Sequence, residues 1–175
     1  MAYAGTPGAG SLYRLDPDLS VTTMLKGVTI SNGLGWSPDG LTMYYIDTPT
    51  RGVDAFAFDP PTGEIADRRR IIDIPPDNGL PDGMTVDSEG GLWVALWGGD
   101  AVHRYLPDGT LERIVELPCR VVTSCAFGGA LLDELFITTA SLGLTPDELE
   151  AQPGAGGLFS CRPGLRGLPS ESFAG

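Results

Sequence analysis

The sequence predicts an all-β protein, specifically a β-propeller, and three observations lead to this prediction. The chain of 175 residues contains Gly 25 and Pro 15 while only 19% of its residues are charged, a composition that disfavours long helices. Its apolar segments have the length of strands and are separated by turn residues. Similar segments also recur every forty to fifty residues, which is the repeat length of propeller blades.

Two copies of the repeat are clear. Residues 32–40 align with residues 82–90 at an offset of fifty, and each segment is a short strand followed by a turn that ends in glycine. The next three strands of each copy are expected at 41–46, 53–58 and 70–74, and at 91–96, 101–106 and 111–117. Each copy therefore predicts one four-stranded antiparallel blade.

Further strands are predicted on both sides of these copies. A looser third copy has expected strands at 123–128, 134–139 and 157–160. Between the last two, Thr145 followed by Glu148 predicts one helical turn with a capping box. The front of the chain adds strands at 2–6, 11–15 and 20–25, which resemble the later strands of a blade.

The predicted repeats do not suffice to close a ring. At about fifty residues per blade the chain forms an incomplete arc of about three and a half four-stranded blades, whereas closed propellers have four to eight. Residues 1–175 are therefore interpreted as one partial propeller domain whose N-terminal blades are missing. Its open ends expose apolar faces, which favours self-association or a partner that supplies the missing blades.

Charge and composition exclude several classes of protein. The net charge of −12 repels polyanions and disfavours nucleic-acid binding, and no apolar run is long enough to span a membrane. The start of the chain lacks the pattern of a secretory signal, so a cytoplasmic location is expected. Cys119, Cys125 and Cys161 are then reduced, buried thiols, and the single histidine, His103, is interpreted as an ordinary strand residue.

Asn32 and Asp82 are the candidate site residues. They occupy the same position in successive copies, and equivalent positions in a propeller face the same mouth of the central channel. An amide and a carboxylate oxygen suit calcium, magnesium, manganese or zinc. An alternative interpretation is purely structural, because Asn-Gly and Asp-Gly are also the preferred dipeptides of tight turns.

Other polar and aromatic residues have weaker functional signals. Thr123 and Ser124 begin the third copy, near the positions that Asn32 and Asp82 hold in theirs, so contact with substrate or β-propensity alone explains them equally well. The tryptophans lie on or beside predicted strands and are interpreted as packing residues, although Trp97 ends its strand and could line the channel mouth. These are Trp36, Trp93 and Trp97.

Several ordered motifs resemble those of the regucalcin / gluconolactonase family, also called the senescence marker protein family. The match runs nearly from end to end, although each motif is weak alone. The motifs are ISNGLGWS (30–37), YYID (44–47), VDAF (53–56), the arginine pair 68–69, PDGM (81–84), LWVA (92–95), TSCAFGG (123–129), AGGLF (155–159) and FAG (173–175).

This resemblance implies a six-bladed propeller that holds one divalent metal ion and hydrolyses sugar lactones such as gluconolactone. In the family the metal ligands are a Glu of the first blade, the Asn of SNGL and the Asp of PDG, and the last two correspond to Asn32 and Asp82. The Glu has no counterpart, because the chain starts near the family's midpoint. Asp82 would also be the catalytic residue that accepts a proton from the attacking water.

Two alternatives to this enzyme remain open. The first is a calcium-binding regulatory propeller of the regucalcin type, in which the same channel holds metal without significant catalysis. The second is an inactive fragment, because two of three expected ligands make at most a weak site. Both share Asn32 and Asp82 with the lactonase hypothesis, so the sequence does not separate the three.

Overall fold

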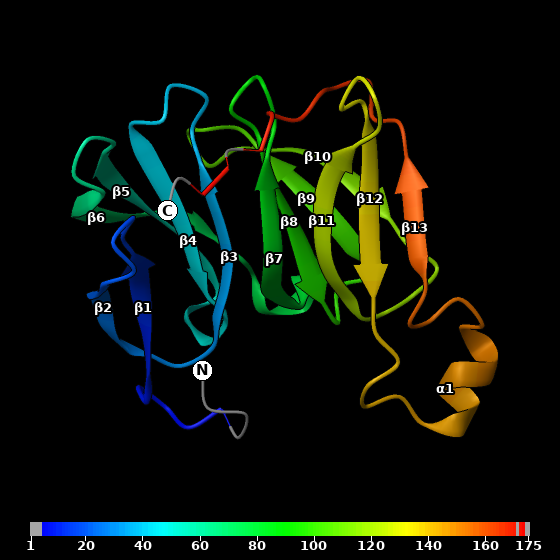
Figure 1. Ribbon diagram of the computed structural model, residues 1–175. Helices are drawn as coiled ribbons and strands as arrows, with labels where there is room; N and C mark the ends of the chain where they lie inside the picture. Colours follow the sequence, from blue (N-terminus) through cyan, green and yellow to red (C-terminus); the bar gives the residue numbers. More distant parts are fainter. Residues whose placement is uncertain (1–4, 171, 174–175) are drawn as a thin grey trace.

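The computed structural model describes residues 5–170 and 172–173, and it is built from antiparallel sheets (Figure 1). Two sheets have four strands each, and they are flanked by a two-stranded and a three-stranded sheet. In chain order the sheets are β1 (Gly10–Leu15) and β2 (Val21–Val28); β3 (Ser31–Trp36), β4 (Thr42–Asp47), β5 (Gly52–Asp59) and β6 (Glu64–Asp73); β7 (Leu80–Val86), β8 (Leu92–Trp97), β9 (Ala101–Tyr105) and β10 (Leu111–Glu116); and β11 (Val122–Gly128), β12 (Glu134–Thr139) and β13 (Leu158–Cys161).

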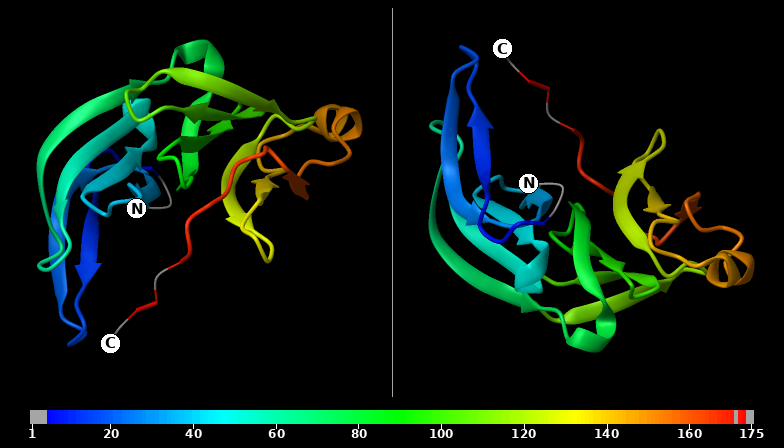
Figure 2. Two further views of the ribbon diagram at one scale, coloured as in Figure 1. Left: turned by 90° about the horizontal axis from the view of Figure 1, so that it is seen from above. Right: turned by 90° about the horizontal axis from the view of Figure 1, so that it is seen from below.

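The sheets follow one another around an open curve, and the C-terminal segment crosses its concave side (Figure 2). The first strands of the three larger sheets are neighbours: β3 packs along β7, and β7 packs along β11. Within each of these sheets the strands pair in chain order, as in a propeller blade. The predicted β-propeller arc is therefore confirmed, with the first strand of each blade beside the first strand of the next.

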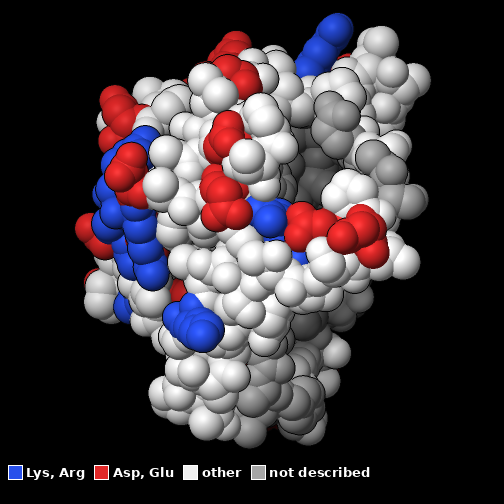
Figure 3. Space-filling model, turned by 60° about the vertical axis from the view of Figure 1, so that its left-hand side comes forward, with Lys and Arg blue, Asp and Glu red and all other residues white. Residues whose placement is uncertain are grey.

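Most predicted strands coincide with observed ones, and the exception is β6. We expected that strand at 70–74, but it begins at Glu64, because its exposed residues carry no apolar alternation that would reveal it. Cross-strand ion pairs extend it instead: Arg68 Nη2 and Arg70 Nε lie 2.6 and 2.7 Å from the buried carboxylate of Asp54. On the face that includes this sheet, positive and negative side chains lie side by side (Figure 3).

The short helix α1 (Pro146–Ala151) forms where the sequence predicts it. Thr145 accepts a hydrogen bond from the Glu148 backbone N–H, and Glu148 Oε2 accepts one from the Thr145 N–H at 2.8 Å. This capping box satisfies donors that the first helical turn leaves free.

Two single 3₁₀ turns, η1 (Thr48–Thr50) and η2 (Pro76–Asn78), precede β5 and β7. Of the first predicted strand, 2–6, residues 2–4 lie outside the described residues, and the prediction is wrong for Gly5 and Thr6, which belong to no strand.

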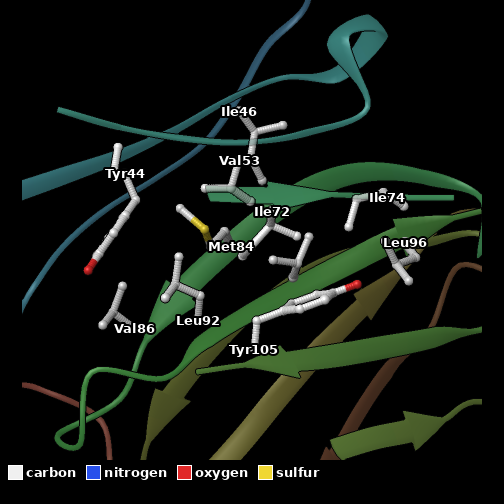
Figure 4. Packing of buried hydrophobic residues seen from close by; sticks show 12 residues of the cluster. Tyr44, Ile46, Val53, Ile72, Ile74, Met84, Val86, Leu92, Leu96 and Tyr105 are labelled. Atoms are coloured by element: carbon white, nitrogen blue, oxygen red, sulfur yellow. The ribbon is translucent and has the colours of Figure 1, made fainter. Parts of the chain in front are cut away.

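The largest apolar core lies between the two four-stranded sheets (Figure 4). Apolar side chains from β4, β5 and β6 meet those of β7, β8 and β9, so each blade covers the face of the next. A second core continues this packing toward β11 and β12 around the fully buried Trp93. The packing interpretation is right for Trp93, whereas Trp36 is 38% exposed and its ring meets the ring of Phe58 edge-on.

The cysteines and the histidine occupy ordinary structural positions. All three thiols are free; Cys119 and Cys125 are buried as expected, while Cys161 on β13 is only half-buried. Burial raises the pKa of Cys125 to about 12, so its thiol stays protonated at neutral pH, and it lowers the pKa of His103, whose Nδ1 lies 3.1 Å from the Tyr105 hydroxyl oxygen in β9. Among the described residues, no helix is long and apolar enough to cross a membrane.

Candidate metal centre

Asn32 and Asp82 lie on neighbouring strands at equivalent points. Asn32 is the second residue of β3 and Asp82 the third of β7, and β3 packs along β7. Both residues fall inside strands, so the interpretation of Asn-Gly and Asp-Gly as tight turns is wrong. The structure therefore brings the two predicted site residues to one place, at the beginning of adjacent inner strands.

The same backbone irregularity occurs at each of these points. The pairing of β3 with β4 is regular at Ser31 and again at Leu34, but shifts between them, and the pairing of β7 with β8 shifts between Pro81 and Met84. In β11 the register shifts between Val122 and Ser124. Such bulges are frequent beside active sites, where they redirect a side chain. Asn32, Asp82 and Thr123 thus lie at three corresponding bulges.

Glycines explain how closely the inner strands approach each other. A Cβ atom on Gly33 would lie 2.7 Å from Met84 Cβ and 2.9 Å from the Asp82 carbonyl oxygen. A Cβ atom on Gly83 would lie 2.5 Å from Ser124 Cβ. All three distances are shorter than real Cβ contacts, so only glycine fits at these two positions. The glycine after each site residue therefore allows β3, β7 and β11 to pack together.

Replacing Gly83 with alanine is expected to cost about 1–3 kcal/mol of the free energy of unfolding, because the added methyl group overpacks the contact with β11. Urea denaturation measures the loss. The matched test is the double variant Gly83→Ala with Ser124→Gly, which removes the contacting side chain and should recover part of the lost stability. No recovery would mean that the methyl group strains something other than this contact.

Asp82 is a carboxylate in a partly desolvated position. Burial raises the pKa of Asp82 to about 6, and the nearby Asn32 amide lowers it only in part. Among the described residues no lysine, arginine or histidine forms an ion pair with Asp82. By contrast, the buried Asp54 and Asp87 both pair with arginines. Asp82 therefore carries a negative charge that no protein cation compensates.

The donor set fits a divalent cation, although it is incomplete. A carboxylate oxygen and an amide oxygen are donors that calcium, magnesium, manganese and zinc accept, and an uncompensated carboxylate favours such an ion. These cations take at least four ligands. Within the described part of the chain no three His, Cys, Asp or Glu side chains cluster, so Asn32 and Asp82 are two candidate donors without a third acidic one beside them.

Comparison with known proteins identifies the family. The description "SMP-30/Gluconolactonase/LRE-like region" applies to a family whose sequence model matches residues 1–141, which is most of the chain. The chain belongs to this family. It is 46% identical over 168 residues to regucalcin of Oryctolagus cuniculus, and 42% identical over 172 residues to YvrE of Bacillus subtilis strain 168, which is named as a sugar lactone lactonase.

The fold is also that of this SMP-30/gluconolactonase family. A crystal structure of a calcium-binding protein, regucalcin, from Agrobacterium tumefaciens superposes with a TM-score of 0.90 at 32% identity, covering 96% of this chain and 57% of that one. The chain spans just over half the length of these relatives. The alignment with the Oryctolagus cuniculus regucalcin covers 95% of this chain and 56% of that protein, and the alignment with YvrE covers 98% of this chain and 59% of YvrE.

The sequence analysis missed Thr48, which contacts both β3 and β7, the strands that carry Asn32 and Asp82. Its hydroxyl is buried, accepts a hydrogen bond from Asn32 Nδ2 at 3.1 Å and donates one to the Pro81 carbonyl oxygen at 2.8 Å. Repeat alignment could not reveal this residue, because position 98 in the next copy is a glycine. The signal available was its place directly after the YYID motif of the family.

The remaining candidates have mixed outcomes. Ser124 packs against Gly83 beside Asp82, and Thr123 Oγ1 lies 2.7 Å from Thr138 Oγ1, so Thr123 has a structural partner on β12. Trp97 lines a cavity of about 430 Å³ that opens beside the start of β7, together with Arg51, Leu80, Arg120 and Leu142. Trp97 thus lines a cavity at the end of its strand, and its place at the channel mouth stays a prediction.

Proposed function

We propose that this chain contributes Asn32 and Asp82 to the divalent-cation site of a cytoplasmic sugar lactone hydrolase. The observation that carries the proposal is their convergence: two oxygen donors project from equivalent bulges of adjacent inner strands, and one is an uncompensated carboxylate. The names of relatives within the family, regucalcin and sugar lactone lactonase, support the same chemistry. Free cysteines support a reducing compartment.

The cation, when bound, supplies Lewis-acid activation of the lactone carbonyl and of water. Asp82 would give that ion a negatively charged ligand or, from a place beside it, would act as the base that accepts a proton from the attacking water. Asn32 adds a neutral oxygen, so it holds the ion without cancelling more of its charge. The chain thus supplies a base and an orienting ligand.

The proposal is tested by cation binding and lactone hydrolysis on the purified chain. Calcium, zinc, manganese and magnesium are titrated calorimetrically, and acid release from gluconolactone is followed with and without each ion. Asp82→Ala is expected to abolish both signals. Asp39→Ala is the matched control, because Asp39 is exposed and only accepts turn hydrogen bonds from Ser37 and Leu41, so this variant should lose stability alone.

Each outcome supports one hypothesis. Binding and hydrolysis that both disappear in Asp82→Ala support the lactonase. Binding that depends on Asp82 without hydrolysis by any ion favours the second function, a calcium-binding regulatory propeller; the regucalcin relatives and the calcium-binding neighbour structure support that alternative. Binding that is equal in wild type and Asp82→Ala contradicts the site itself, and no binding at all favours an inactive fragment.

The proposal includes blades that complete the ring. The chain covers 56% of its rabbit relative, and apolar side chains such as Tyr13, Val21 and Leu158 are exposed near the two ends of the arc. The blades come from residues encoded before Met1, from a partner chain or from a second copy. Translation of the upstream DNA tests the first source, and sedimentation velocity of the purified chain tests the last: a monomer excludes self-association.

A further inference from the structure

The turn after β4 holds both strands that carry the candidate ligands. Asp47 accepts hydrogen bonds from the backbone N–H groups of Thr29 and Ile30, at 3.0 and 2.7 Å, and so fixes the segment that leads into β3. Arg51 Nη2 donates to the carbonyl oxygen of Gly79 at 2.6 Å, directly before β7. Between these two residues, Thr48 is 7% exposed and lies between the strands themselves.

The hydroxyl of Thr48 has only one proton, and this restricts its partners. That proton is donated to the Pro81 carbonyl oxygen, which can only accept. The hydroxyl oxygen can therefore only accept from Asn32, and the group of Asn32 that faces it must be the NH₂ group. The order of donors and acceptors thus fixes the orientation of the Asn32 amide. Its nitrogen faces the Thr48 hydroxyl, and its carbonyl oxygen is turned away from that hydroxyl.

We propose that Thr48 is a positioning residue that keeps the carbonyl oxygen of Asn32 available to a divalent cation and holds it at a fixed spacing from Asp82. Pro81 directly precedes Asp82, so the same hydroxyl connects Asn32 with the backbone of the strand that carries the carboxylate. No hydrogen bond from the described residues reaches Asn32 Oδ1. This inference rests on the proposed cation site and adds the group that orients one of its ligands.

Valine is the informative substitution, because it keeps the shape of threonine and removes the hydroxyl. Without the Thr48 hydroxyl, the Asn32 NH₂ group keeps only the Asp82 carboxylate as an acceptor, so the amide loses the contact that fixes its orientation and more often presents nitrogen instead of oxygen. Loss of a group that orients a metal ligand typically weakens metal affinity by about 10- to 100-fold. We expect Thr48→Val to weaken manganese binding by at least about 10-fold, and Thr48→Ser, which keeps the hydroxyl, to remain close to wild type.

A control variant in the same turn separates orientation from stability. Thr50 Oγ1 donates to the Asp47 carbonyl oxygen at 2.8 Å and does not contact Asn32, so Thr50→Val disturbs the turn but not the amide. Manganese affinity is measured by electron paramagnetic resonance, and thermal unfolding is recorded for each variant. Thr50→Val should lose stability with unchanged affinity. Equal affinity of wild type and Thr48→Val, in a chain where Asn32→Ala and Asp82→Ala abolish binding, would overturn the inference.

A second readout needs no metal. In the metal-free chain, the side-chain NH₂ protons of Asn32 should exchange slowly with solvent in wild type and Thr48→Ser, and faster in Thr48→Val, when followed by NMR. If wild type binds no manganese, the proposed cation site fails, but this comparison still decides whether Thr48 orients Asn32. Equal exchange in wild type and Thr48→Val would show that it does not.

Discussion

Replacing Asp87 with alanine is expected to cost about 3–5 kcal/mol of the free energy of unfolding, because it removes the only fully buried carboxylate that pairs with Arg104 among the described residues and leaves it the more exposed Glu89 and Glu112. Asp87 is fully buried, and its Oδ2 lies 2.7 Å from Arg104 Nε, which belongs to a side chain that is 4% exposed. The same carboxylate also accepts hydrogen bonds from the Trp93 indole and from the backbone N–H groups of Glu89 and Gly91. The substitution therefore removes the hydrogen-bond acceptor of four donors in the sheet of β7 to β10.

Urea denaturation of wild type, Asp87→Ala and Asp108→Ala tests this expectation. Asp108 is a matched control, because it also accepts a turn hydrogen bond, from the Thr110 N–H at 2.9 Å, but is exposed and has no buried partner. A domain of this size has a total stability of about 5–15 kcal/mol, so Asp87→Ala should be close to unfolding while Asp108→Ala remains folded. Similar losses in both variants would contradict a special role for the buried pair.

The same pair gives stability a defined dependence on pH. Burial alone would raise the pKa of Asp87, but the hydrogen bonds from Arg104, Trp93 and Gly91 outweigh it and hold the pKa below the ordinary value of 3.8. A carboxylate with a lowered pKa in the folded state contributes stability above its unfolded pKa and loses it as pH falls through the folded one. This contribution is therefore complete at neutral pH and disappears only in strong acid.

The repeat made much of the fold predictable. Glycine-terminated turns and short apolar strands recur at an offset of fifty, and this regularity alone placed Asn32 and Asp82 at equivalent positions of adjacent blades. The structure bears out that equivalence, since Asn32 and Asp82 lie in corresponding bulges of the adjacent strands β3 and β7. The repeat already made a cation site and a tight turn the two hypotheses for these residues, and the family resemblance favoured the cation site.

Other features depend on contacts that have no local pattern. The first half of β6 is mostly polar and exposed; its residues pair with the end of β5, and Arg68 reaches the buried Asp54 of β5 across the sheet. The bulges arise from the register between strands, and the sequence does not state that register. Thr48 acts between two blades, so neither its own strand pattern nor the repeat predicts its contact with Pro81, thirty-three residues away.

Asp82→Asn is expected to remove divalent-cation binding and, in the same chain without metal, to increase stability at neutral pH. Burial raises the folded-state pKa of Asp82 to about 6, above the ordinary value of 3.8. The folded state therefore binds more protons than the unfolded state between these values, and stability falls as pH rises from about 4 to about 6. Asparagine has no charge to desolvate, so the variant avoids this loss.

Thermal unfolding in EDTA between pH 4 and pH 8 measures the difference. Above about pH 6 the variant should be more stable than wild type by on the order of 1 kcal/mol, a figure that allows for the solvent reaching this half-buried carboxylate, and below about pH 4 the two should converge. Adding a cation should reverse the order, because only wild type binds it and gains stability from binding. A variant that is less stable than wild type at every pH would contradict an uncompensated charge at Asp82, and with it the physical reason for a cation there.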